Sequence, residues 1–170
     1  MNIFAVSRYP QKCAEALDDK RLNKMILETA QILCTVINLD AGKQVTPYRN
    51  CHVNHPIVKW AVDNRKRGAW SWLYALGIAY GNEIQYRFGR KHACQLVIEG
   101  LSLNHPHLLE YNQELIKKRL EFYNGASHKA FGLSFKHLPW RLAYKEYLKA
   151  RWKKDKRVPK WTKRGRPSWA

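Results

Sequence analysis

Apolar residues recur along most of this chain at spacings of three and four positions. Within residues 14–38 the spacing runs from Leu22 to Val36 and is typical of a helix with one buried face. The same pattern predicts further helices over residues 54–66, 70–88, 91–100, 108–123 and 139–153. Because the chain shows neither an internal repeat nor the alternation of a strand, we predict an all-α fold, a compact single-domain helical bundle.

Other segments depart from this helical pattern. Residues 2–6 form a short apolar run, which fits either a single strand or a buried extended arm at the N-terminus. Gly77 and Gly81 lie four positions apart in a predicted helix and leave a shallow strip on which another helix can approach closely. Loops or irregular structure are predicted over residues 40–54, 101–107 and 124–135.

The composition changes at the C-terminal end of the chain. Residues 153–170 contain eight Lys and Arg residues against one Asp, together with Trp161 and Trp169. Two prolines and a glycine argue against a regular helix here, so we predict a helical domain over residues 1–152 and a basic aromatic tail over 153–170. The tail either lies along a phosphate backbone and stacks on bases, or packs its tryptophans onto the body of the protein.

The overall composition indicates a folded protein that binds a polyanion. Lys and Arg number 31 and Asp and Glu 13, which gives a formal net charge of +18. Hydrophobic residues make up 45% and aromatic residues 12%, which excludes a disordered basic polypeptide. Because phosphates neutralise such a charge and aromatic rings stack on bases, nucleic acid is the predicted partner.

The cysteines and the apolar runs indicate the compartment. The four cysteines contain no CxxC pair, and no segment approaches the roughly 20 uninterrupted apolar residues of a membrane span. Residues 1–10 do not resemble a signal peptide. We therefore predict a cytoplasmic monomer with reduced cysteines and no membrane partner, acting in the host cytoplasm if phage-encoded.

A polar stripe runs along the first long predicted helix. Lys20, Lys24 and Glu28 are spaced four apart and share one face, with Asp19 and Arg21 at its start. One interpretation is surface ion pairing, worth about 0.3 kcal/mol for a pair such as Lys24 and Glu28. The other is catalytic, because a lysine held near other cations becomes a usable nucleophile and a neighbouring carboxylate can transfer protons.

Further candidate residues lie near predicted helix ends. His55 belongs to an NHP motif at a helix start and is added to the catalytic candidates, whereas His128 is expected in a loop or on the surface. A zinc site built from the Cys51–His55 and His92–Cys94 segments matches no common spacing, so we predict no metal and no cofactor. The basic residues around Gly89 form either a plain surface or a phosphate clamp. The predicted nucleic-acid contacts are Arg21, Lys59, Trp60, Tyr86, Arg87, Arg90, His92, Lys160, Trp161, Arg164 and Trp169.

Several segments together resemble a small family of mostly uncharacterised phage and bacterial proteins. They include DDKRLNKMILETAQILCT (18–35), NHPIVKW (54–60), NEIQYRFGRKH (82–92) and KWTKRGRPSW (160–169). That family has CDKHVVKM where this chain has DDKRLNKM, so Asp18 and Arg21 replace a Cys and a His. These two changes argue against a metal site or a histidine-dependent mechanism there. The polar or aromatic residues shared with the family are Lys20, Lys24, Glu28, His55, Lys59, Trp60, Glu83, Arg87 and His92.

More distantly, the layout is similar to that of the phage pyrimidine-dimer DNA glycosylase of the endonuclease V type. This resemblance implies a small basic all-α enzyme with an N-terminal arm, an amine at the mature N-terminus as nucleophile and a Glu on the first long helix. In this chain Met1 precedes Asn2, whose size hinders removal of Met1. The family's Glu aligns near Asn23, and Glu28 lies one turn further on.

Two functions follow from these observations. The first is a DNA glycosylase, with or without abasic-site lyase activity, that acts on damaged or modified bases in double-stranded DNA. Its nucleophile is Lys20, Lys24 or the Met1 amine, and its carboxylate is Glu28 or Asp19. The alternative is a non-catalytic nucleic-acid-binding phage protein, with RNA a weaker candidate than DNA.

Overall fold

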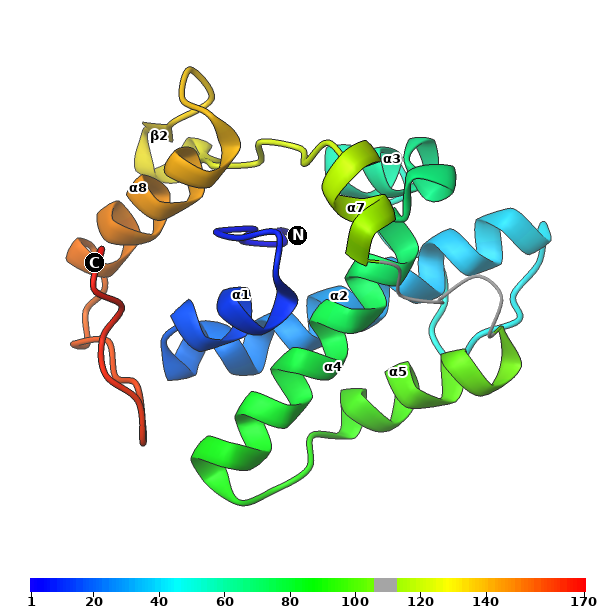
Figure 1. Ribbon diagram of the computed structural model, residues 1–170, viewed down its shortest axis with the longest axis horizontal. Helices are drawn as coiled ribbons and strands as arrows, with labels where there is room; N and C mark the ends of the chain where they lie inside the picture. Colours follow the sequence, from blue (N-terminus) through cyan, green and yellow to red (C-terminus); the bar gives the residue numbers. More distant parts are fainter. Residues whose placement is uncertain (106–112) are drawn as a thin grey trace.

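The protein folds as a set of packed helices with one very short pair of strands (Figure 1). The computed structural model describes residues 1–105 and 113–170. The all-α prediction is confirmed. In chain order the elements are α1 (Pro10–Ala16), α2 (Asp19–Ala41), α3 (Pro56–Asp63), η1 (Arg65–Arg67), α4 (Ala69–Phe88), α5 (Ala93–Asn104), α7 (Gln113–Arg119), β1 (Ser127–His128), η2 (Lys129–Phe131), β2 (Leu133–Ser134) and α8 (Trp140–Lys153).

The core forms where α2 and α4 cross, with α1 and α5 packed against them (Figure 1). The apolar faces predicted from the sequence are the buried ones: Leu22, Ile26 and Leu33 of α2 are fully buried, as is Leu73 of α4. Burial of these side chains drives the assembly of helices that are only moderately stable alone. No helix within residues 1–105 and 113–170 is long and apolar enough to cross a membrane.

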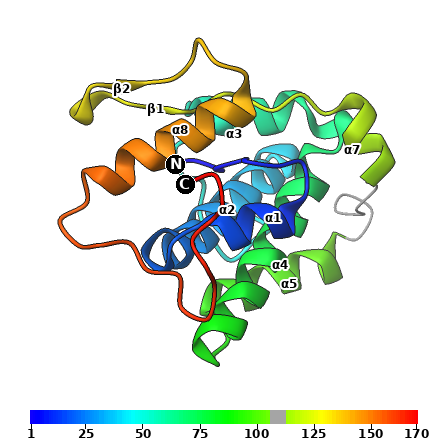
Figure 2. The same ribbon diagram turned by 60° about the vertical axis from the view of Figure 1, so that its left-hand side comes forward.

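The N-terminal residues form a buried extended arm, one of the two forms predicted for residues 2–6. Ile3 and Ala5 are completely buried, and the Tyr80 hydroxyl donates a hydrogen bond to the Ile3 carbonyl at 3.3 Å. The arm runs alongside α8 and over α2 (Figure 2), and the Phe4 ring stacks on Tyr147 of α8 at 5.7 Å between centroids. Because it is fixed at several points, the arm places the first residues at a defined position.

The helix predicted over residues 14–38 is in fact two helices. Leu17 adopts extended backbone angles after α1, and Asp18 caps α2 by accepting a hydrogen bond from the Arg21 amide at 3.4 Å. A capping aspartate stops the preceding helix and starts the next one, a signal that apolar spacing does not carry.

The region after residue 100 also differs from the prediction. The loop predicted from residue 101 was wrong at its start, because α5 continues to Asn104 with Leu101 buried. Of the helix predicted over 108–123, residues 113–119 are helical as α7 and residues 108–112 lie outside the described part. The segment predicted as irregular contains the β1–β2 hairpin, in which Ser127 pairs with Ser134 and His128 with Leu133.

The tail packs onto the body of the protein, which favours the second of its two interpretations. Trp161 donates a hydrogen bond from Nε1 to the Ala16 carbonyl at 3.1 Å and meets Trp152 edge to face. Trp169 stacks on the same Trp152 at 5.7 Å between centroids. Both indoles therefore hold the tail in place, and they do not lie free for stacking on bases.

The predicted glycine strip is confirmed and gives a stability prediction. A Cβ at Gly77 would lie 2.6 Å from Cδ1 of Ile98 and 3.4 Å from Cγ2 of Thr29, so α4 packs closely on α5 and α2. We expect Gly77→Ala to lower the free energy of unfolding by about 1–3 kcal/mol through overpacking. The matched control is Gly100→Ala in α5, where no atom lies within 4 Å. It should leave that free energy unchanged or raise it by up to about 1 kcal/mol. Equal losses in chemical denaturation would contradict this packing.

Candidate active site

A pocket of about 230 Å³ opens where the N-terminal arm, α2, the β1–β2 hairpin and α8 come together. It holds the first residues of the chain against the polar stripe of α2. Four of the residues predicted to be functional share this pocket, namely Lys20, Arg21, Lys24 and Glu28. The rest of its lining consists of Met1, Asn2, Phe4, Met25, Ser127, His128, Tyr147 and Arg151.

Glu28 is the carboxylate of this pocket, and its side chain is only 12% exposed. Its Oε2 accepts a hydrogen bond from the Asn2 backbone nitrogen at 2.8 Å and lies 4.0 Å from the Met1 α-amine. Its Oε1 lies 3.2 Å from Nζ of Lys24. One carboxylate therefore faces two amines, one at the start of the chain and one on its own helix.

The start of the chain is positioned by Asn2. The Asn2 side chain accepts hydrogen bonds from the amides of Ile3 and Phe4, at 2.8 and 3.2 Å, and donates to the Gly125 carbonyl at 3.2 Å. Phe4 has φ 38°, in the left-handed region that a bulky residue rarely adopts. The Met1 side chain is 2% exposed while the residue as a whole is half-buried, so its exposed part is main chain.

The two lysines of the stripe differ in their partners. Lys24 pairs with Glu28, as predicted for a surface ion pair, and also lines the pocket. Lys20 lies 3.6 Å from Asp155, a residue at the start of the tail. Both lysine side chains are more than 70% exposed, at 77% for Lys20 and 71% for Lys24, so their ammonium groups are well solvated.

His55 lies outside the pocket lining but within reach of its charges. It caps α3 by accepting a hydrogen bond on Nδ1 from the Ile57 amide at 3.2 Å. Burial lowers the pKa of His55, the charges of the Met1 amine and His52 lower it further, and Glu28 opposes them. The structure thus favours a neutral imidazole near the α-amine.

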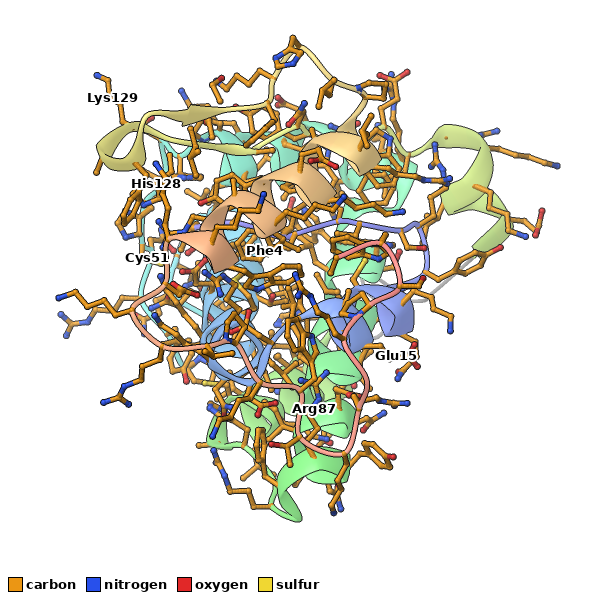
Figure 3. The ribbon with its side chains drawn as sticks, turned by 90° about the vertical axis from the view of Figure 1, so that its left-hand side faces the viewer. Phe4, Glu15, Cys51, Arg87, His128 and Lys129 are labelled. Carbon is orange, nitrogen blue, oxygen red and sulfur yellow. The ribbon has the colours of Figure 1, made fainter. Side chains whose placement is uncertain are left out.

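Asp19 and Arg87 belong to a separate cluster, which we call the tail clasp: Glu15, Asp19, Glu83, Arg87 and Arg164. Arg87 is completely buried and donates to Glu83 at 2.7 Å and to Asp19 at 3.0 Å. Arg164 of the tail donates twice to Glu83, at 2.9 Å each. Figure 3 shows Arg87 and Glu15 well away from Phe4 of the pocket. These side chains hold the tail to α2 and α4, so Asp19 and Arg87 do not face the pocket.

Two more of the predicted DNA contacts are buried. Trp60 is 7% exposed, stacks near Phe122 and donates from Nε1 to the Glu121 carbonyl at 2.7 Å. Arg21 bridges Asp18 and Asp155 at 2.8 Å each, although it also contributes to the pocket wall. Both side chains have hydrogen-bond partners within the protein. A structural role therefore explains these two residues, and no contact with DNA is needed to explain them.

The remaining predicted DNA contacts are not buried. Tyr86 is 49% exposed, donates to the Lys163 carbonyl at 3.2 Å and lies under the Arg164 guanidinium. Arg90 is exposed and donates to the Asn23 side chain at 2.9 Å. His92 caps α5, and burial, then the Arg90 charge, lowers its pKa. Lys59 and Lys160 have exposed side chains.

The comparisons with known proteins place the chain in a family. The family model for pyrimidine dimer DNA glycosylases matches residues 1–95, more than half of the chain. The chain belongs to this family. No match was found among curated proteins or among solved structures. A pyrimidine dimer DNA glycosylase has DNA as its substrate, and this accounts for the net charge of +18.

The matched range, residues 1–95, contains the N-terminal arm, Lys24 and Glu28. It does not contain the wall of the pocket that β1 and α8 form. That wall includes His128, which we expected in a loop or on the surface, and Tyr147 and Arg151, which we did not single out. They come from β1 and α8, more than 95 residues after Glu28 in the sequence, so only the fold brings them to the pocket. Within the described residues no group of three or more His, Cys, Asp or Glu side chains could hold a metal ion.

Proposed function

We propose that this protein cleaves the glycosyl bond of pyrimidine dimers in double-stranded DNA and then cleaves the strand as an abasic-site lyase. The nucleophile is the α-amine at the start of the N-terminal arm, and Glu28 is the acid–base and electrostatic partner. One observation carries this proposal. The largely buried carboxylate of Glu28 lies 4.0 Å from the Met1 nitrogen and accepts a hydrogen bond from the Asn2 nitrogen at 2.8 Å.

The chemistry begins with the neutral α-amine. It attacks C1′ of the damaged nucleotide, and the bond from C1′ to the base nitrogen breaks as the new C–N bond forms. The base leaves with the electron pair and takes up a proton, while Glu28 accepts the proton that the amine loses. The bond from C1′ to the ring oxygen then breaks, the oxygen is protonated, and an iminium ion remains.

The iminium ion accounts for both lyase activity and the need for Glu28. Loss of a proton from C2′ lets the 3′ phosphate leave, which cleaves the strand, and water then hydrolyses the imine and frees the amine. The positive charge at C1′ develops beside the carboxylate of Glu28, whose side chain is only 12% exposed, and this carboxylate stabilises it.

The α-amine suits this role better than the two lysines. Lys20 and Lys24 are highly exposed side chains, whereas the α-amine begins an arm that the hydrogen bonds of Asn2 fix beside Glu28. Removal of Met1 would leave the Asn2 nitrogen as the α-amine, already bonded to Glu28.

The activity is tested with three otherwise identical duplexes: one with a single thymine dimer, one with a single abasic site and one undamaged. We expect strand cleavage at the dimer and at the abasic site and none in the undamaged duplex. Binding to all three without any cleavage would contradict the proposal and favour the non-catalytic DNA binder.

A further inference from the structure

Two nitrogen atoms on residues that line the pocket lack the partners that buried polar atoms normally have. Nδ1 of His128 and Nη1 of Arg151 are both buried, and neither has a hydrogen-bond partner among the residues that the structure describes. Both residues line the pocket that holds Glu28 and the α-amine. Because buried donors are almost always paired, two such atoms at one pocket indicate a ligand that accepts hydrogen bonds.

Phe131 holds these two side chains together. The Arg151 guanidinium lies 4.0 Å from the centre of the Phe131 ring, and the His128 ring meets the same ring edge to face at 4.7 Å. Lys154 of the segment after α8 donates to the Phe131 carbonyl at 2.8 Å, which ties the hairpin to that helix. Figure 3 shows Lys129 extending away from the hairpin and His128 beneath it. The two side chains that carry the unpaired nitrogens are therefore packed against one ring.

The charge around these groups identifies the ligand as an anion. Lys20 and Lys24 have exposed ammonium groups at the rim, and the Met1 α-amine adds a third cation. The Glu28 carboxylate is already bound to the Asn2 nitrogen and to Lys24. Arg21 is already paired with Asp18 and Asp155. In a DNA substrate the anion nearest to a reacting C1′ is a phosphate of the same strand.

We propose that Arg151 and His128 bind a backbone phosphate next to the reacting sugar, with Phe131 as the residue that positions them. This site rests on the proposed function, since it takes C1′ to be at the α-amine. Arg151 donates from Nη1 to a phosphate oxygen, and His128 donates from Nδ1 in the tautomer that carries its proton there. Both residues follow the matched range 1–95, so family membership assigns them no role.

The test is equilibrium binding to a duplex that carries a tetrahydrofuran abasic-site analogue, which has no C1′ leaving group and is not cleaved. We expect Arg151→Ala to weaken binding about tenfold and to lower the slope of log K against log salt by about one. Arg157→Ala removes one exposed charge outside the pocket and is the matched control. His128→Ala should weaken binding about threefold or more, and its control is His137→Ala at an exposed position.

The effect must be specific to the damaged site. Arg151→Ala should reduce the preference for the analogue over undamaged duplex, whereas Arg157→Ala should weaken both alike. Phe131→Leu, which keeps the charge but removes the ring, should reproduce part of the Arg151→Ala loss, and circular dichroism confirms that each variant is folded. Equal effects of Arg151→Ala and Arg157→Ala would overturn this inference while wild-type cleavage stood. Absence of wild-type cleavage with the Arg151 effect intact would overturn only the proposed chemistry.

Discussion

Glu28→Gln should lower the rate of strand cleavage at a thymine dimer by roughly 10²–10⁴-fold, the usual contribution of a positioned acid–base group. Glutamine has nearly the same shape and can still accept the hydrogen bond that the Asn2 nitrogen gives to Glu28. It has no charge, so it neither takes the proton of the α-amine nor stabilises the iminium ion. Single-turnover rates with excess enzyme measure this loss separately from binding.

The matched control removes a carboxylate that is not part of the pocket. Glu99 of α5 pairs with Lys91 at 2.7 Å and is 37% exposed. Glu99→Gln should leave the single-turnover rate within about twofold of wild type. Glu99 lies outside the pocket, and an exposed ion pair of this kind contributes little to the stability of the fold. A Glu28→Gln rate within threefold of wild type, in a folded variant, would rule Glu28 out as the catalytic carboxylate.

Arg87→Ala should lower the free energy of unfolding by about 3–5 kcal/mol, since it breaks a buried ion pair on one side only. Arg87 is completely buried and also donates to the carbonyls of Leu17 and Glu15, at 2.8 and 3.1 Å. Its removal leaves the two carbonyls without this donor and takes one of two bonding partners from Asp19, which keeps Thr162, and from Glu83, which keeps Arg164. Chemical denaturation measures the loss. The control is Arg90→Ala, which removes an exposed arginine bonded to the Asn23 side chain and should cost less than about 1 kcal/mol.

The tail clasp also predicts a dependence of stability on pH. Burial alone would raise the pKa of Glu83, but the hydrogen bonds and charges of Arg164 and Arg87 outweigh it, so the pKa is lowered from its ordinary 4.5. A lowered carboxylate pKa contributes stability that is present above the ordinary value and is lost as the pH falls through the lowered one. Wild type should therefore lose stability in acid below about pH 4.5 more steeply than Glu83→Gln, whose side chain does not titrate.

Much of the fold can be predicted from apolar spacing, because buried helix faces leave a periodic signal. The faces of α2 and α4 follow directly from it, and so does the close approach of a second helix at Gly77. Helix ends set by single hydrogen bonds, such as the Asp18 cap, leave no periodic trace. The short β1–β2 hairpin has too few residues for an alternating pattern.

The candidate site, like the fold, can be predicted only in part from the sequence. The spacing of Lys20, Lys24 and Glu28 predicts one shared face, and the structure puts that face at the pocket. The same spacing cannot predict which neighbour Glu28 meets, because the N-terminal arm reaches it only through contacts with residues such as Tyr80 and Tyr147. Charge alone did not separate Arg87, a buried structural arginine, from the arginines available to DNA.

Borohydride trapping followed by peptide mapping tests the central claim most directly. The protein is mixed with the abasic-site duplex, sodium borohydride reduces the imine to a stable amine, and mass spectrometry locates the attached sugar. We predict that it lies on the α-amine of the N-terminal peptide, residues 1–8, whose mass also shows whether Met1 or Asn2 carries it. Attachment to Lys20 or Lys24, with the N-terminal peptide unmodified, would contradict the assignment of the α-amine beside Glu28 as the nucleophile.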